Sequence, residues 1–178
     1  MARHASTVFM DLAETFVRRN LLYAAIREFF HSRGYLEVET PILVASPDMS
    51  PSLTPFVTNV STVDDRQYIG ALVTSPEFSM KKLLGEGLER IFTLTKVFRN
   101  SDFFVDDTPK QHNPEFTMLE WYRQGMDYIE GMEETEALIA YCFKKIAPPL
   151  SGGAISRMHL PSKFKEVTDL DLSEATSD

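Results

Sequence analysis

Cysteine and long apolar runs are scarce in this sequence. Cys142 is the single cysteine in 178 residues, which excludes an internal disulfide and any metal site built from several cysteines. No apolar run approaches the length that a membrane-spanning helix needs. Residues 1–8 contain Arg3 and His4 but no apolar core after them, so they do not form a secretory signal. We therefore expect a cytoplasmic protein with no membrane-spanning segment.

Positive charge is also scarce, and the net charge is −8. Proteins that bind nucleic acid usually carry a basic surface, because contacts to phosphates dominate their affinity. Adjacent basic residues occur at Lys81–Lys82 and Lys144–Lys145, and neither pair makes a patch. Extensive contact with tRNA or DNA is therefore not expected. An acidic surface suits a basic partner, but solubility explains the sign of the charge equally well.

Composition and length are those of a soluble globular protein. Hydrophobic residues make up 43% of the chain and charged residues 25%, and the length allows one domain with a core. Pro148 and Pro149 precede Ser151-Gly152-Gly153, which marks a break in the chain. We expect one domain over residues 1–147, followed by a linker and a polar C-terminal segment over residues 148–178.

Hydrophobic periodicity predicts alternating helices and strands along the first domain. A helix that begins near Ser75 has this serine as its N-cap and Pro76 at its first helical position. Residues 100–114 are predicted to form a loop. The predicted helices are Phe9–Ser32, Ser75–Leu84, Tyr128–Ile146 and a short one near Pro161–Val167. The predicted strands are Tyr35–Val38, Phe56–Val60, Arg66–Val73, Ile91–Arg99 and Glu115–Arg123.

The strand Glu115–Arg123 carries chemically distinct residues on one face. Side chains alternate between the two faces of a strand, so Phe116, Met118, Glu120 and Tyr122 share one face. Arg99 ends the preceding strand. This arrangement would suit a nucleotide and a cationic ligand, because it combines the aromatic ring of Phe116, the carboxylate of Glu120 and the nearby Arg99.

Each of these residues also has a structural interpretation. A phenylalanine in a strand usually belongs to the core, and an isolated arginine usually pairs with a neighbouring carboxylate such as Asp102 or Asp106. A carboxylate on a mostly apolar strand is costly unless it is paired, so Glu120 could form an ion pair within the protein. Glu77 could simply compensate the dipole of its helix, without any contact to a ligand. His112 and Asn113 could be turn residues.

Three ordered segments resemble the class II aminoacyl-tRNA synthetases. Residues 33–43 are similar to motif 1 of this family, and residues 98–120 to its motif 2. Residues 74–81 resemble the amino-acid-binding segment of the lysyl branch. Residues 118–123 are most similar to the elongation factor P–lysine ligases, which are paralogues of lysyl-tRNA synthetase. The resemblance covers residues 9–146.

The resemblance implies a fold, a reaction and a quaternary structure. The fold would be α+β, with an antiparallel β-sheet flanked by helices. The reaction would activate lysine or β-lysine with ATP and Mg²⁺, giving an aminoacyl adenylate and pyrophosphate. The adenylate would pass to a lysine of elongation factor P. The motif 1 helix would form a homodimer interface.

The resemblance also assigns roles to individual residues. Arg99 would be the catalytic residue that binds the α-phosphate, and Phe116 would stack on adenine. Glu120 and Tyr122 would hold the side-chain amine of lysine, and Glu77 would face its α-amine. The residues implied in ATP binding are Arg99, Asn100, Ser101, His112, Asn113 and Phe116. The residues implied in substrate binding are Ser75, Pro76, Glu77, Glu120 and Tyr122.

The sequence departs from the family pattern in three ways. No motif 3 follows residue 146, so the fold would be incomplete there, the Mg²⁺ ligands would be absent, and this chain alone would be inactive. Residues 85–90 are similar in sequence to motif 3, but they precede motif 2 and are therefore not taken as motif 3. Ser101 stands where the family has a glutamate for adenine, and the motif 2 loop is long.

The position of Met1 and the missing motif 3 leave more than one functional hypothesis. Met1 lies close to the first helix and leaves no room for an anticodon-binding domain, which favours the elongation factor P ligases over a fragment of a lysyl-tRNA synthetase. A non-catalytic dimerising paralogue is a further alternative, because motif 3 is missing and Ser101 replaces the glutamate of the family.

Overall fold

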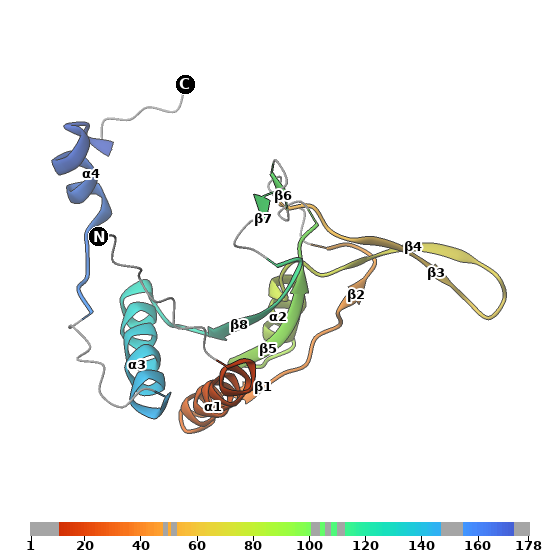
Figure 1. Cartoon of the computed structure of the whole chain (residues 1–178), viewed down its shortest axis with the longest axis horizontal. Coiled ribbons are helices and arrows are strands. Elements are labelled where there is room, and N and C mark those ends of the chain that lie inside the picture. The colour runs from red at the N-terminus through yellow and green to blue at the C-terminus, as the bar shows by residue number, and fades with distance from the viewer. Residues whose placement is uncertain are drawn as a thin grey trace, which may run out of the picture. The chain divides into compact units, whose positions relative to one another are not determined.

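The computed structural model describes residues 11–47, 50, 53–100, 104–105, 108–109, 113–146 and 155–172. Contacts divide the chain into two units, Met1–Ile146 and Ala147–Asp178. Among the described residues, the first unit holds three helices and eight strands, and the second holds one helix (Figure 1). None of the helices in these ranges is long and apolar enough to cross a bilayer.

The first helix, α1 (Leu12–His31), is buried only in its C-terminal half. It begins where the Asp11 carboxylate accepts a hydrogen bond from the Ala13 N–H, at 3.2 Å. It ends shortly before Gly34, whose φ of +76° favours glycine. The predicted helix Phe9–Ser32 contains α1, and its first two residues lie outside the described ranges. The buried residues of α1 are Ala25, Ile26, Phe29 and Phe30.

The central sheet has the strand order β1-β5-β8, with β1 at Leu36–Glu37, β5 at Arg90–Phe98 and β8 at Glu115–Arg123. β5 and β8 pair antiparallel over their whole lengths. The predicted α+β fold is confirmed, and the predicted limits of β8 are correct. One pairing differs from the expected antiparallel sheet, because β1 runs parallel to β5. The long connection over residues 38–89 allows the chain to re-enter the sheet in the same direction.

A second sheet, β2-β4-β3, forms an arm that extends from the central sheet (Figure 1). β3 (Val57–Ser61) and β4 (Gln67–Leu72) are an antiparallel hairpin whose turn includes Asp65 at φ +60°. Both strands of this hairpin were predicted, as Phe56–Val60 and Arg66–Val73. β2 (Leu43–Val44), which pairs with β4, was not predicted, because Pro41 marks the end of the preceding strand.

The segment predicted as a loop over residues 100–114 contains a short strand pair. β6 (Phe104–Val105) and β7 (Thr108–Pro109) pair antiparallel. The prediction of a loop without its own structure was therefore wrong for these four residues. Strands of two residues carry too short a hydrophobic pattern to be read from sequence.

The described residues form three further helices, and their limits are close to the predicted ones. α3 (Tyr128–Ile146) has the predicted limits, and α4 (Leu160–Thr168) nearly so. α2 (Glu77–Gly85) begins two residues later than predicted, with Pro76 at the N-cap position. Ser75 nevertheless satisfies the helix start, because its Oγ accepts a hydrogen bond from the Glu77 N–H at 3.1 Å.

The main core lies between the central sheet and the helices α1 and α3. Phe30 of α1 stacks on Phe92 of β5, with ring centroids 4.8 Å apart. Leu138 and Cys142 of α3 join the same cluster, and Trp121 of β8 packs against it. One face of β8 is thereby fixed against the core, which leaves the alternate side chains of β8 to the opposite face.

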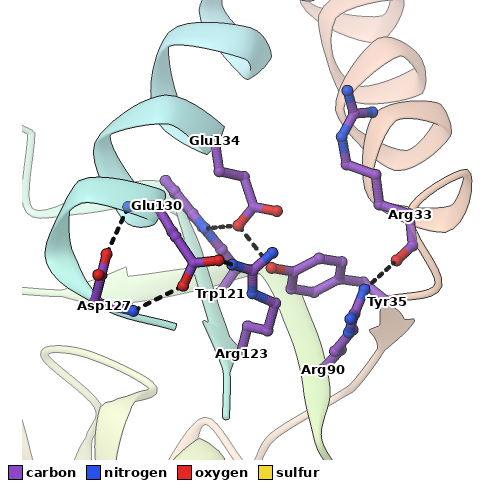
Figure 2. A network of polar contacts seen from close by, with 8 residues as sticks. All are labelled: Arg33, Tyr35, Arg90, Trp121, Arg123, Asp127, Glu130 and Glu134. Carbon is purple, nitrogen blue, oxygen red and sulfur yellow. Dashed lines mark hydrogen bonds and ion pairs between the residues drawn. The ribbon is translucent and has the colours of Figure 1, made fainter. Parts of the chain in front are cut away.

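A carboxylate on α3 connects this core to the end of α1 and to β8 (Figure 2). Oε2 of Glu134 accepts hydrogen bonds from the Tyr35 hydroxyl at 2.6 Å and from Nε1 of Trp121 at 3.2 Å. Burial, and then the hydrogen bond to Glu134, raise the pKa of Tyr35, so this hydroxyl stays a donor. Nearby, Glu130 pairs with Arg123 at 2.9 Å.

We predict that Glu134→Ala destabilises the fold by about 1–3 kcal/mol, because two donors, Tyr35 and Trp121, lose their acceptor. Urea unfolding followed by tryptophan fluorescence measures the change, since Trp121 is the single tryptophan. Lys144→Ala, an exposed change on the same helix, is the control and should have little effect. Equal stability of Glu134→Ala and Lys144→Ala would contradict the role of this carboxylate.

Candidate active site

Arg99 and Phe116 lie together where β5 ends and β8 begins. The Arg99 N–H donates to the Pro114 carbonyl at 3.0 Å, and Phe116 is paired with Val97 across the strands. Cζ of Arg99 lies 5.3 Å from the centroid of the Phe116 ring. Nε of Arg99 is buried and has no hydrogen-bond partner among the described residues. A buried unpaired donor of this kind is suited to an anionic oxygen from a ligand.

The Glu120 carboxylate lies further along β8, on the same face by strand alternation. Its Oε1 accepts a hydrogen bond from the Tyr122 hydroxyl, and its Oε2 accepts one from Oγ of Ser75 at 3.1 Å. Within the described part of the chain, no lysine or arginine forms an ion pair with Glu120. The two oxygens are therefore held by neutral donors, and the charge of the carboxylate is not neutralised by either of them.

The donors to Glu120 have fixed roles. Because Oγ of Ser75 already accepts a hydrogen bond from the Glu77 N–H, its own proton is available for Glu120. Burial, followed by the hydrogen bond to Glu120, raises the pKa of Tyr122. The phenol thus stays protonated and donating at physiological pH. The geometry orients a half-buried carboxylate without supplying a cation.

Glu77 has a cationic partner one helical turn away. Nζ of Lys81 donates to Oε1 of Glu77 at 2.5 Å. The hydrogen bond and charge of Glu77 raise the pKa of Lys81, with a smaller contribution from the charge of Glu120. Glu77 is consequently engaged by Lys81 as well as lying at the start of α2, where it complements the helix dipole.

The comparison with known families identifies the chain's relatives. Residues 1–176 match the family model of tRNA synthetases class II (D, K and N). The chain belongs to this family. A lysine–tRNA ligase of Pasteurella multocida (strain Pm70) is 41% identical over 145 residues, which are 82% of this chain and 26% of that protein.

Two other relatives of this chain differ in name and in the share of their length that is matched. A lysine–tRNA ligase of Oceanobacillus iheyensis is 32% identical, over 94% of this chain and 34% of that protein. An elongation factor P–(R)-β-lysine ligase of Avibacterium paragallinarum is 43% identical over 129 residues, covering 72% of this chain and 38% of that protein. The chain thus spans between about a quarter and two-fifths of the length of these relatives.

The remaining predicted site residues of this chain differ in exposure, and two of them lie outside the described residues. Asn100 and Asn113 are exposed, and the Asn100 N–H donates to the Thr54 carbonyl at 2.8 Å. Pro76 is buried beneath the start of α2. Ser101 and His112 lie outside the described residues.

Sequence reasoning missed three polar residues around the site. Thr93 lies opposite Glu120 in the sheet and is buried. Thr74 is also buried, and its hydroxyl has no partner among the described residues. Lys81 could have been found from the Glu-x-x-x-Lys spacing, which brings the two charges together on a helix. Thr74 and Lys81 lie in the segment 74–81 that resembles the amino-acid-binding segment, but no role was given to them, and nothing in the pattern marks Thr93.

The described residues do not fit a magnesium site. They contain no group of three or more aspartate, glutamate, histidine or cysteine side chains able to hold a metal ion. Glu77 is paired with Lys81, and both oxygens of Glu120 accept hydrogen bonds. We therefore assign no metal-dependent step to these residues.

We predict that Tyr122 ionises at a pH well above the ordinary tyrosine value of about 10. Since the folded-state pKa is raised, its stabilising contribution is complete below the unfolded pKa and is lost as pH rises through the folded pKa. The difference between the absorbance titrations of the wild type and Tyr122→Phe isolates this group. Glu120→Gln should lower the midpoint, because a negative neighbour is removed. A difference titration with its midpoint near the ordinary value would contradict the hydrogen bond.

Proposed function

We propose that this chain binds lysine, or β-lysine, together with ATP, and contributes to the formation of an aminoacyl adenylate. The observation that carries the proposal is the Glu120 carboxylate, which Ser75 and Tyr122 orient with neutral hydroxyls. A half-buried carboxylate that forms no ion pair among the described residues favours an ammonium ligand. The lysine in the names of the relatives supports the same ligand.

The nucleotide would bind at the other end of the same strand pair. Arg99 presents an unpaired buried donor beside the Phe116 ring, which suits a phosphate next to an aromatic base. Asn100, Ser101, His112 and Asn113 complete the ATP-binding set that the family resemblance implies. The lysine carboxylate would attack the α-phosphate, and pyrophosphate would leave.

Arg99 would contribute by positioning the phosphate and by compensating the negative charge that develops there. Covalent catalysis by the thiol is not part of this proposal. Cys142 is packed in the core between α1 and α3, and burial raises the pKa of its thiol, so the reactive thiolate is disfavoured.

The acceptor of the activated amino acid would be a protein lysine of elongation factor P. The Avibacterium relative carries that substrate in its name, and the net charge of −8 does not favour extensive tRNA contact. Transfer to tRNA is the alternative, as the names of the lysine–tRNA ligases suggest. We expect the completed reaction to require the parts of the relatives that this chain does not match.

A homodimer through α1 is the second part of the proposal. The N-terminal half of α1 leaves Leu12 71%, Phe16 52% and Val17 60% exposed. Large apolar side chains grouped on one helix are typical of protein interfaces. A dimerising paralogue without ligand binding would also use this surface, so the two tests below separate binding from dimerisation.

We predict that Glu120→Gln and Arg99→Ala each weaken the binding of one ligand and spare the other. Glu120→Gln should weaken lysine about tenfold or more and leave ATP nearly unchanged, because a charge-assisted hydrogen bond is lost. Arg99→Ala should weaken ATP by a similar factor and spare lysine. Isothermal titration calorimetry on the whole chain measures both, and each variant is the other's control.

Norleucine, which has the length of lysine but no side-chain amine, is the comparison ligand. The wild type should bind norleucine far more weakly than lysine. If lysine and norleucine bind equally, Glu120 does not select an ammonium. If neither lysine nor ATP binds, the non-catalytic dimer is the better interpretation.

We predict that Phe16→Glu shifts the chain from dimer to monomer in sedimentation velocity, because a charge replaces an apolar side chain at the interface. Thr15→Glu adds the same charge to an exposed neighbouring position and should leave the dimer intact. A wild-type chain that sediments as a monomer would exclude this interface.

A further inference from the structure

The second carboxylate of the candidate site is not free in the structure. Glu77, which the family resemblance places opposite the α-amine of the amino acid that we propose binds here, is already paired with Lys81. The two side chains lie one turn apart on α2, and Nζ of Lys81 is 2.5 Å from Oε1 of Glu77. An ammonium from the chain therefore stands where an ammonium from the ligand is expected.

This ion pair belongs to the amino-acid site and not to a remote helix surface. Ser75 links the start of α2 to Glu120, because its Oγ accepts a hydrogen bond from the Glu77 N–H and donates one to the Glu120 carboxylate. The pKa of Lys81 is raised first by Glu77 and, to a smaller degree, by Glu120. Lys81 is thus close enough to sense the charges of both carboxylates.

We propose that Lys81 is a tethered competitor for the amino-acid site. Its ammonium occupies the cation position at Glu77 when the chain has no ligand, and the α-amine of the bound amino acid displaces it. The inference rests on the proposed function, since Glu77 must receive that amine. The exchange replaces one ammonium by another, so no proton or net charge is transferred to Glu77.

Displacement of Lys81 from Glu77 requires little free energy, so the binding of an amino acid can drive it. The Lys81 and Glu77 side chains are 53% and 38% exposed, and exposed ion pairs of this spacing contribute little to stability. A ligand with an α-amine regains the interaction with Glu77. A ligand without one has no group that competes with Lys81.

The alternative explanation is an ordinary helix-stabilising pair. Glutamate followed four residues later by lysine is common on helices and needs no ligand. Such a pair should remain intact when an amino acid binds. The two explanations therefore differ in what happens to the Lys81 ammonium upon ligand addition.

The test compares lysine with 6-aminohexanoate, which is lysine without its α-amine. Calorimetry on the whole chain should show that Lys81→Met tightens lysine about twofold, as expected for loss of a weak exposed pair. The affinity for 6-aminohexanoate should not change. Lys82→Met is the matched control, because Lys82 is the next residue of α2 and lines a hollow with Phe78 and Leu83 instead of contacting Glu77. It should leave both affinities unchanged.

A second measurement follows the Lys81 ammonium directly in the wild-type chain. The ¹H–¹⁵N signal of the Lys81 ammonium, assigned by its loss in Lys81→Met, should shift much further on addition of lysine than on addition of 6-aminohexanoate, whose amine reaches Glu120 but does not displace Lys81 from Glu77. Circular dichroism confirms that Lys81→Met and Lys82→Met are folded.

Several outcomes would overturn the inference. Weaker lysine binding by Lys81→Met would make Lys81 a contributor to binding. An unchanged ammonium signal in a chain saturated with lysine would make the pair purely structural. Both results leave the proposed function standing, because lysine still binds. A wild-type chain that binds no lysine overturns the proposed function, and this inference falls with it.

Discussion

The antiparallel pairing of β5 with β8 is the constraint on which the rest of the structure depends. Its register places Val97 opposite Phe116 and Thr93 opposite Glu120, so the arginine after β5 meets the aromatic ring at one end of the pair. Because side chains alternate, a slip of one residue would turn Glu120 into the core and Trp121 out of it. The same pairing thus decides what the core contains and what the site presents.

Neutral hydroxyls are an effective way to hold a carboxylate whose proposed role is to bind a cation. A lysine or arginine partner would stabilise Glu120 more strongly but would also satisfy its charge, and a ligand would have to displace it. Ser75 and Tyr122 fix the direction of the carboxylate while leaving the charge to be paired. Glu77 shows the other arrangement, since Lys81 neutralises it directly. The two carboxylates therefore differ in how easily an amine can approach them.

The sequence was informative wherever a pattern extended over many residues. The limits of β8 and α3 and the shared face of Glu120 and Tyr122 follow from periodicity, and the family motifs locate Arg99. The two-residue strands β2, β6 and β7 were missed, because none of them lies in a longer stretch with a strand-like pattern, whereas β1 lies within the predicted strand Tyr35–Val38. The parallel direction of β1 depends on a long connection rather than on local pattern. The pairing of Glu134 with Tyr35 joins residues 99 positions apart, and no local signal encodes it.

The two faces of β8 connect stability with the chemistry of the site. Trp121 is held by Glu134 on the core side, while its neighbours Glu120 and Tyr122 form the carboxylate–phenol pair on the other side. Loosening the core contact would let this part of β8 rotate or shift, and the distance from Ser75 to Glu120 would then vary. A hydrogen bond of 3.1 Å tolerates little displacement before it is lost. Orientation of the Glu120 carboxylate is therefore a property of the packed strand, so under the proposed function a polar network on the core side of the sheet affects a ligand that does not touch it.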